Sequence, residues 1–168
     1  FIRVLRDDIL VYIETEYVDK VYRDSYYRYY SSKALEFPRN CIRLSFFENK
    51  GKVFKKGHDI SFNDRDVVRS SYLGFMVLRP TVPKLIGRSA ISPLAFRNHC
   101  FKTCMVSIPA TVAGFKVKVD AFPFSSQDTE SITCAETTLW ALMEYFGNKY
   151  PEYSPILPSN IVEVLKAN

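Results

Sequence analysis

Residues 134–147 read CAETTLWALMEYFG and predict a helix that opens on a cysteine. Thr133 precedes this segment and Glu136 follows three residues later, which is the spacing of a capping box. Apolar residues recur at helical intervals, so we expect one buried face made of Leu139, Leu142, Met143 and Phe146. Gly147 is expected to end the helix in a left-handed conformation.

Cys134 takes the first helical position in this prediction. A thiol attacks a carbonyl only as thiolate, and the N–H groups at a helix N-terminus lower the pKa of a thiol placed there. Gln127 lies seven positions earlier across a polar segment, so its side-chain amide can lie beside the backbone N–H of Cys134. Two such donors would form an oxyanion hole, each worth roughly 3 kcal/mol. The alternative is a buried structural cysteine, and the carboxylate of Glu136 would oppose a thiolate.

The order of these features resembles the papain-like cysteine peptidases: a glutamine, a short polar loop, a cysteine that opens a helix, and an Ala-x-x-x-Leu pattern. The closest resemblance is to the double-glycine peptidases that process bacteriocin leaders, and it covers residues 124–168. Thr133 and Ala135 replace the acidic residue and the glycine that flank the thiol in that group. The resemblance implies a hydrolase or acyl transferase that acts on a peptide or isopeptide bond. It also implies a peptide or protein substrate and no cofactor.

The sequence contains no histidine after Cys134 that could act as the general base of a papain-like enzyme. In papain-like enzymes the base is a histidine downstream of the cysteine. Both histidines, His58 and His99, precede Cys134, so either would require a permuted order. Phe1 is not an initiator methionine, and a second predicted helix at 159–166 stops near the chain end. We therefore expect the chain to be an excerpt, with the histidine on a missing C-terminal segment or a second chain.

The composition is that of a globular chain. Of 168 residues, 47% are hydrophobic and 24% charged, enough for one core. No apolar stretch approaches the length of a membrane span, and the charged N-terminus is unlike a signal peptide. Four cysteines are too few and too unevenly placed for a disulfide framework. We expect a cytoplasmic protein without a membrane span.

Two other binding functions rank below the peptidase reading. The net charge of +5 invites a nucleic-acid partner, but the basic residues are scattered apart from one lysine-rich cluster at 50–56. His99, Cys100 and Cys104 suggest a metal site, yet no second close pair of ligands accompanies them. We therefore predict no metal and rank nucleic-acid binding last.

The remaining pattern predicts an α+β fold with a mainly antiparallel β region. A helix with buried tyrosines is expected at 17–33, a loop at 48–66, a hairpin connection at 109–114, and strands at 9–13, 41–47, 72–78, 85–91, 102–108 and 115–122. We interpret 1–122 as a region of unknown role and 123–168 as the start of a papain-like domain.

Two further interpretations stay open. Arg79 and Arg88 lie near the ends of neighbouring predicted strands, where they either hold an anionic ligand or form salt bridges. The rival to the enzyme is a non-catalytic papain-like module that binds a peptide or protein through aromatic side chains.

Overall fold

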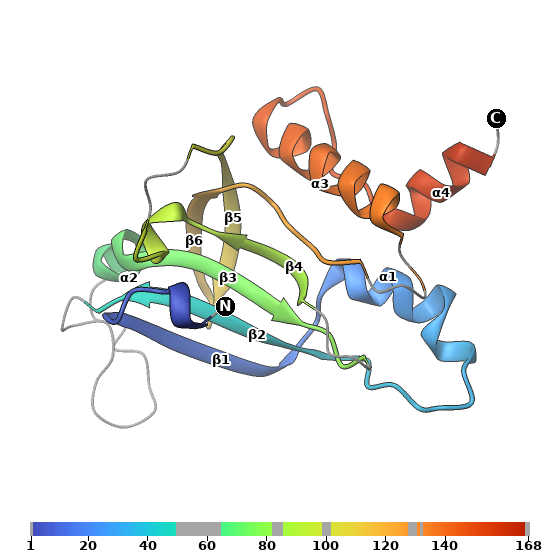
Figure 1. The fold of residues 1–168 in the computed structure, drawn as a ribbon, viewed down its shortest axis with the longest axis horizontal. Helices are drawn as coiled ribbons and strands as arrows, with labels where there is room; N and C mark the ends of the chain where they lie inside the picture. Colours follow the sequence, from blue (N-terminus) through green and yellow to red (C-terminus); the bar gives the residue numbers. More distant parts are fainter. Residues whose placement is uncertain are drawn as a thin grey trace.

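The computed structural model describes residues 2–49, 65–81, 86–98, 102–127, 131 and 133–166. Within these ranges the chain has the predicted α+β fold, and every strand pair is antiparallel (Figure 1). The strands are β1 (Ile9–Tyr17), β2 (Cys41–Glu48), β3 (Tyr72–Leu78), β4 (Ile86–Ile91), β5 (Val106–Val112) and β6 (Phe115–Ala121). The helices are α1 (Lys20–Arg28), α2 (Arg65–Ser71), α3 (Cys134–Lys149) and α4 (Pro158–Lys166), with 3-10 turns at Ile2–Val4, Tyr30–Ser32 and Pro93–Ala95.

The first four strands form one sheet in the order β1-β2-β3-β4. Alternation along β2 sends Phe47 to one core cluster and Phe46 to another, on opposite faces of the sheet. Gly74 of β3 has φ +120, and a Cβ there would lie 2.1 Å from the carbonyl oxygen of Ala90 on β4. Only glycine fits this close approach of β3 to β4. The pairing of β2 with β3 changes register at the same place, where Phe46 pairs with Gly74 and Phe47 with Tyr72.

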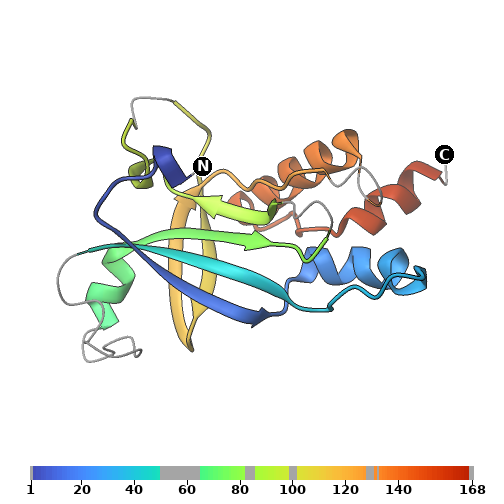
Figure 2. The ribbon, with the colours of Figure 1, turned by 60° about the horizontal axis from the view of Figure 1, so that its bottom comes forward.

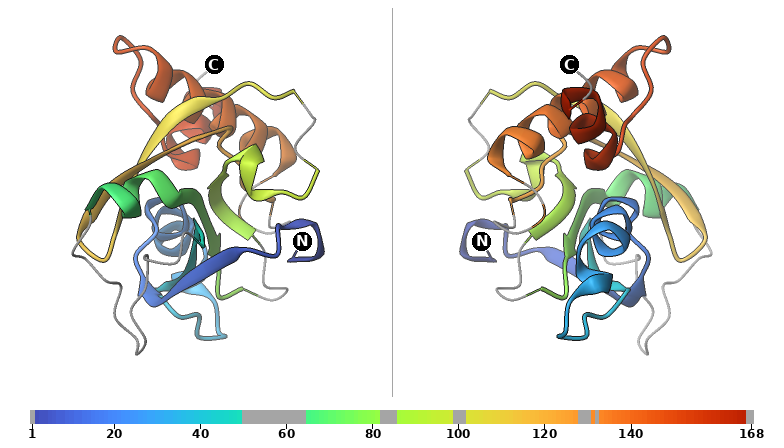
Figure 3. Two further views of the ribbon diagram at one scale, coloured as in Figure 1. Left: turned by 90° about the vertical axis from the view of Figure 1, so that its left-hand side faces the viewer. Right: turned by 90° about the vertical axis from the view of Figure 1, so that its right-hand side faces the viewer.

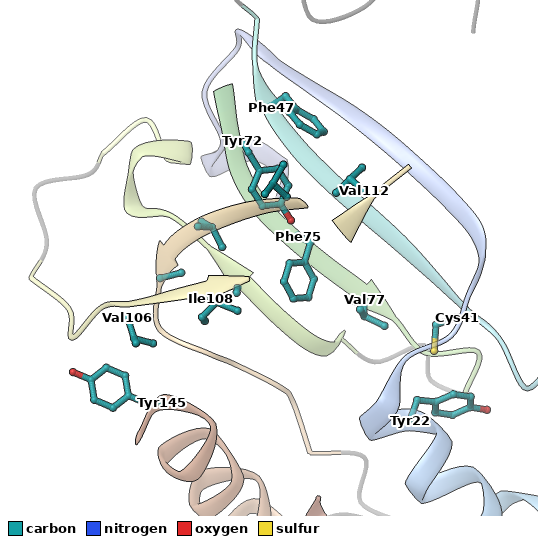
Figure 4. Packing of buried hydrophobic residues seen from close by; sticks show 14 of the residues in the cluster. Tyr22, Cys41, Phe47, Tyr72, Phe75, Val77, Val106, Ile108, Val112 and Tyr145 are labelled. Atoms are coloured by element: carbon teal, nitrogen blue, oxygen red, sulfur yellow. The ribbon is translucent and has the colours of Figure 1, made fainter. Parts of the chain in front are cut away.

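The hairpin of β5 and β6 packs across the inner face of the sheet (Figure 2). The largest core cluster fills the space between them, with Phe47, Phe75 and Val77 from the sheet facing Ile108 and Val112 from the hairpin (Figure 4). Full burial of each of the two phenylalanines contributes roughly 1.5–3 kcal/mol. The hairpin is therefore fixed to the sheet by apolar packing.

Helices α3 and α4 lie on the side of the molecule away from β1, next to the hairpin and α1 (Figure 3). A separate cluster joins them to α1 and contains Val21, Trp140, Ala141 and Ile161. The cysteine-bearing helix thus packs on elements from the first part of the chain.

Several predicted boundaries were wrong. The helix expected at 17–33 begins only at Lys20, because Asp19 caps it with its carboxylate and Tyr17 still pairs with Cys41 in the sheet. The strand expected at 102–108 begins at Val106, and Pro109 belongs to β5 instead of the connection. The hairpin turns at Ala113 and Gly114, which both have positive φ, as a two-residue turn requires.

The predicted loop at 48–66 falls largely outside the described residues. Of its described residues, Glu48 is the last of β2 and Arg65 and Asp66 are the first two of α2. The tyrosines expected to face a core do so: Tyr22 and Tyr30 are buried, and Tyr26 and Tyr29 are half-buried against the same core cluster. Among the described residues, none of the helices combines the length and apolarity that crossing a bilayer would demand.

Candidate active site

Cys134 is the first residue of α3, as predicted, and it is exposed. Thr133 is the N-cap, and its hydroxyl accepts a hydrogen bond of 3.4 Å from the backbone N–H of Glu136. The Glu136 carboxylate accepts one of 2.6 Å from the backbone N–H of Thr133, which completes the predicted capping box. The start of the helix, and with it the thiol, is therefore fixed by two reciprocal hydrogen bonds.

The buried face of α3 differs from the predicted one. Leu139, Leu142 and Phe146 are exposed, whereas the buried residues are Trp140, Ala141, Glu144 and Tyr145. Both faces carry apolar residues, so the periodicity alone did not distinguish them. Glu144 faces inward because cations from two other elements reach its carboxylate, Arg88 at 3.6 Å and Lys20 at 3.1 Å. The thiol-bearing helix is thus held by packing and charge together.

Gly147 does not end α3, which continues to Lys149. A Cβ at Gly147 would lie 2.6 Å from the backbone nitrogen of Pro155. The residue is glycine because the returning chain packs directly against the helix backbone, and its φ is not in the left-handed region.

Gln127 and Cys134 line one surface groove of about 430 Å³. Both side chains are exposed. The rest of the lining is mostly apolar or hydroxylic and includes Phe122, Phe124 and Leu142. The two residues singled out from sequence, which stand on either side of a polar segment, therefore share one groove beside the helix N-terminus.

Both histidines of the sequence, His58 and His99, lie outside the described residues. The three residues considered as a metal site, His99, Cys100 and Cys104, also lie partly outside the described residues. Of the three, only Cys104 is described, and it is exposed. Within the described ranges no group of three His, Cys, Asp or Glu side chains is arranged to hold a metal.

The other described cysteines differ from Cys134 in their surroundings. Cys41 is buried, and its burial together with the nearby Asp19 charge raises the pKa of its thiol to about 12. Cys104 is exposed but lies in a segment without helix or strand. Cys104 is therefore a natural internal reference for the reactivity of an exposed thiol in this chain.

Asp19 and Glu144, the carboxylates that surround Arg88, were not identified from the sequence. The Arg88 Nε donates to the Asp19 carboxylate at 3.2 Å, and Glu144 lies on its other side. Burial lowers the pKa of Arg88, but the carboxylates of Asp19 and Glu144 outweigh it and raise the pKa overall. Of the two earlier interpretations of Arg88, the salt bridge is therefore present. The sequence signal for this group was Glu144, a carboxylate that lies on the predicted helix close to the aromatic residues Trp140 and Tyr145.

Arg79, the other arginine named in the sequence analysis, is buried and reaches Ser126, one of the residues that line the groove. Its Nη2 donates to the carbonyl oxygen of Ser126 at 2.8 Å and to the hydroxyl of Ser126 at 3.2 Å. Ser126 immediately precedes Gln127. Arg79 therefore positions the backbone that carries Gln127.

Comparisons with protein-family models, curated proteins and solved structures gave no match for this chain.

Proposed function

We propose that this chain carries the nucleophile of a cysteine hydrolase or acyl transferase that acts on a peptide or isopeptide bond. Cys134 would be the nucleophile, and Gln127 with the backbone N–H of Cys134 would hold the oxyanion. The observation that carries the proposal is that Gln127 and an exposed Cys134 line the same groove at the capped N-terminus of α3. Helix N-termini favour negative charge, which suits a thiolate.

The chemistry divides into two steps. A histidine takes the thiol proton and the sulfur attacks the substrate carbonyl, which forms a tetrahedral oxyanion. The imidazolium then gives that proton to the leaving nitrogen, and the oxyanion collapses to a thioester as the C–N bond breaks and the amine leaves. Water or a second amine then attacks the thioester and releases the thiol. We propose that the histidine lies outside the described residues, on a further segment or a second chain. No cofactor takes part in either step.

The lining of the groove supports a proposal for the residue of the substrate that would lie beside the thiol. Phe122, Phe124 and Leu142 form an apolar wall, so an apolar side chain next to the scissile bond would be accommodated. Hydroxyl groups of Thr137 and Thr138 lie on the helix side of the groove. A peptide with an apolar residue at this position is the proposed substrate class.

The first experiment measures alkylation of the native chain by iodoacetamide at neutral pH, with each cysteine followed by peptide mass spectrometry. We expect Cys134 to react at least about tenfold faster than Cys104, because the latter is exposed but lacks a helix N-terminus. Cys41 should react slowest, since it is buried. Equal rates at Cys134 and Cys104 would argue against the enzyme.

A second experiment tests Gln127. A peptide aldehyde adds reversibly to a thiol and forms a tetrahedral adduct that resembles the reaction intermediate. Gln127→Ala should weaken this adduct by at least about tenfold while leaving alkylation by iodoacetamide unchanged, since alkylation develops no oxyanion. Loss of both reactions would show that the substitution disturbed the groove instead.

The second candidate is the non-catalytic peptide-binding module, and one observation favours it. Leu139, Leu142 and Phe146 form an exposed apolar face on α3, next to the ring cluster of Phe146, Tyr150 and Tyr153. An exposed patch of this kind is typical of a protein contact. A module would retain peptide binding in Cys134→Ala with slow, equal alkylation of Cys134 and Cys104 in the parent chain.

A further inference from the structure

A second cavity, separate from the thiol groove, lies between the inner face of the sheet and the hairpin. Its volume is about 850 Å³, within the range of small-molecule sites. Its charged lining consists entirely of cations: Arg43, Arg69, Arg88, Lys116 and Lys118. The cavity therefore combines the apolar surfaces of a β-sheet core with a concentration of positive charge.

Arg43 forms part of the cavity wall contributed by β2. Its side chain is only 4% exposed, its Nε donates to the Glu14 carboxylate and its Nη2 to the carbonyl oxygen of Thr111, both at 2.5 Å. A guanidinium has five N–H donors, and the hydrogen bonds to described residues use two of those on Arg43. The remaining donors suit an oxyanion entering the cavity.

Arg88 supplies a second guanidinium from β4. Its Nη2 donates to the hydroxyl of Tyr17 at 3.4 Å, and its guanidinium lies over the ring of Phe75 at 4.9 Å. Tyr17 in turn lies under the guanidinium of Arg43, 4.2 Å from the ring centroid. The Tyr17 ring therefore links the two guanidinium groups and holds them over the same inner surface.

The hairpin and α2 place three more cations at the cavity. Lys116 and Lys118 on β6 are exposed and form no ion pair within the described ranges of the chain. Arg69 donates to the carbonyl oxygen of Lys116 at 3.4 Å, and its ion pair with Asp66 is long, at 3.9 Å, and exposed. Among the described residues, ion pairs engage Arg43 and Arg88, whereas none engages Lys116 or Lys118.

We propose that this cavity binds a small organic anion. Its carboxylate or phosphate group would accept charge-assisted hydrogen bonds from the donors of Arg43 that Glu14 and Thr111 do not use. Arg88, which is bound to Asp19, Glu144 and Tyr17, would line the cavity beside it, and Lys116 and Lys118 would attract the anion at the mouth. An apolar body would pack on Tyr17, with Val117 and Ala110 supplying the opposite wall. The cavity is independent of Cys134, so the proposal does not rest on the proposed enzyme function.

The test is calorimetric titration of the whole chain with three aromatic probes at one ionic strength. Phenyl phosphate and benzoate represent the two anionic head groups, and benzyl alcohol is the uncharged counterpart. We expect one or both anions to bind with a Kd below about 1 mM and the alcohol not to bind. Whichever head group binds more tightly identifies the ligand class. Binding of the alcohol as tightly as the anions, or of no probe, would overturn the proposal.

Variants then locate the binding. Lys116→Gln with Lys118→Gln should weaken anion binding about fivefold, because two exposed attractive charges are lost. The matched control is Lys33→Gln with Lys166→Gln, two exposed lysines outside the cavity, which should leave the Kd unchanged. An equal loss in both pairs would indicate a non-specific charge effect and contradict the proposal.

Arg43→Lys tests the guanidinium itself. The charge is kept but the planar set of donors is lost, so we expect binding to weaken at least about tenfold, with the fold checked by circular dichroism. If this variant does not fold, the lysine pair still decides the outcome. A different result would overturn the proposal in favour of a nucleic-acid surface. In that case a duplex oligonucleotide binds the parent chain, the two lysine substitutions weaken this binding, and phenyl phosphate does not bind.

Discussion

Arg88 of β4 and Glu144 of α3 form an ion pair that joins the sheet to the cysteine-bearing helix, with Nη1 and Oε1 3.6 Å apart. Both are largely buried, with side chains 14% and 4% exposed. Asp19, the N-cap of α1, accepts a hydrogen bond from the Nε of the same arginine. One guanidinium thus connects β4, α1 and α3, the elements that position the thiol and the anion cavity.

Removing this cation should destabilise the fold strongly. In Arg88→Met the carboxylates of Asp19 and Glu144 stay buried but lose the guanidinium that pairs with them. We therefore expect the free energy of unfolding, measured in urea, to fall by about 3–5 kcal/mol. The control is Asp7→Asn, which removes the exposed pair of Asp7 with Arg97 and should cost no more than about 1 kcal/mol. Equal costs for the two substitutions would mean that the buried pair does not organise the fold.

The buried thiol of Cys41 should make the fold less stable at alkaline pH. Its pKa is raised from an ordinary 9.0 to about 12, so above pH 9 the unfolded chain releases a proton that the folded chain retains. The stabilisation is therefore complete below pH 9 and is lost toward pH 12, with a slope approaching 1.4 kcal/mol per pH unit. Urea titrations between pH 8 and 10 should show a shallower decline in Cys41→Ala.

Tyr22 and Tyr72 add to the same trend at higher pH. Burial raises the pKa of both phenols, so each contributes stability that is lost as the unfolded phenol ionises above about pH 10. Restricting the Cys41 comparison to pH 8–10 separates the thiol from these two groups. A Cys41→Ala chain with an unchanged slope in this window would contradict the assignment.

The charge of Glu136 should restrain the reactivity of Cys134. Glu136→Gln keeps the capping-box hydrogen bonds and removes a negative charge from the first turn of α3, which favours a thiolate there. We expect alkylation of Cys134 at pH 7 to become roughly two- to threefold faster. Glu152→Gln, an equal charge change at an exposed residue that does not line the groove, should have no effect. A slower reaction in Glu136→Gln would contradict this electrostatic account.

Gly147→Ala gives two opposite expectations, and the sign of the result decides between them. Helix propensity alone predicts that the free energy of unfolding rises by about 1 kcal/mol, because alanine favours a helix more than glycine does. The contact with Pro155 predicts that the free energy of unfolding falls by about 1–3 kcal/mol, because the new Cβ would lie 2.6 Å from the backbone nitrogen of Pro155. We expect the fall, measured by urea unfolding. Thr138→Ala, an exposed position on the same helix, should not destabilise the fold.

The sequence predicted the elements whose causes are local. The capping box of Thr133 and Glu136 was predicted because its partners are three residues apart. Strand β3 was predicted at its observed bounds, Tyr72–Leu78, because its apolar run sets it apart from the polar segments around it. Gln127 and Cys134 were singled out in the same way, from residue type and spacing along the chain.

The features that sequence reasoning missed depend on residues that are distant along the chain. The inward face of α3 is set by Arg88 and Lys20, which reach Glu144 from a strand and another helix. The choice of glycine at position 147 is set by Pro155, and the cationic cavity arises only where Arg43, Arg88 and the hairpin lysines meet.

By itself the sequence therefore determined the α+β class, the capped start of α3 and the pairing of a glutamine with a cysteine as candidate site residues. Only the tertiary structure decided which face of α3 is buried and that Gln127 and Cys134 share a groove. The physical reason is range: hydrogen bonds at a helix end and strand alternation act over a few residues, whereas burial and ion pairing depend on which distant segments are brought into contact.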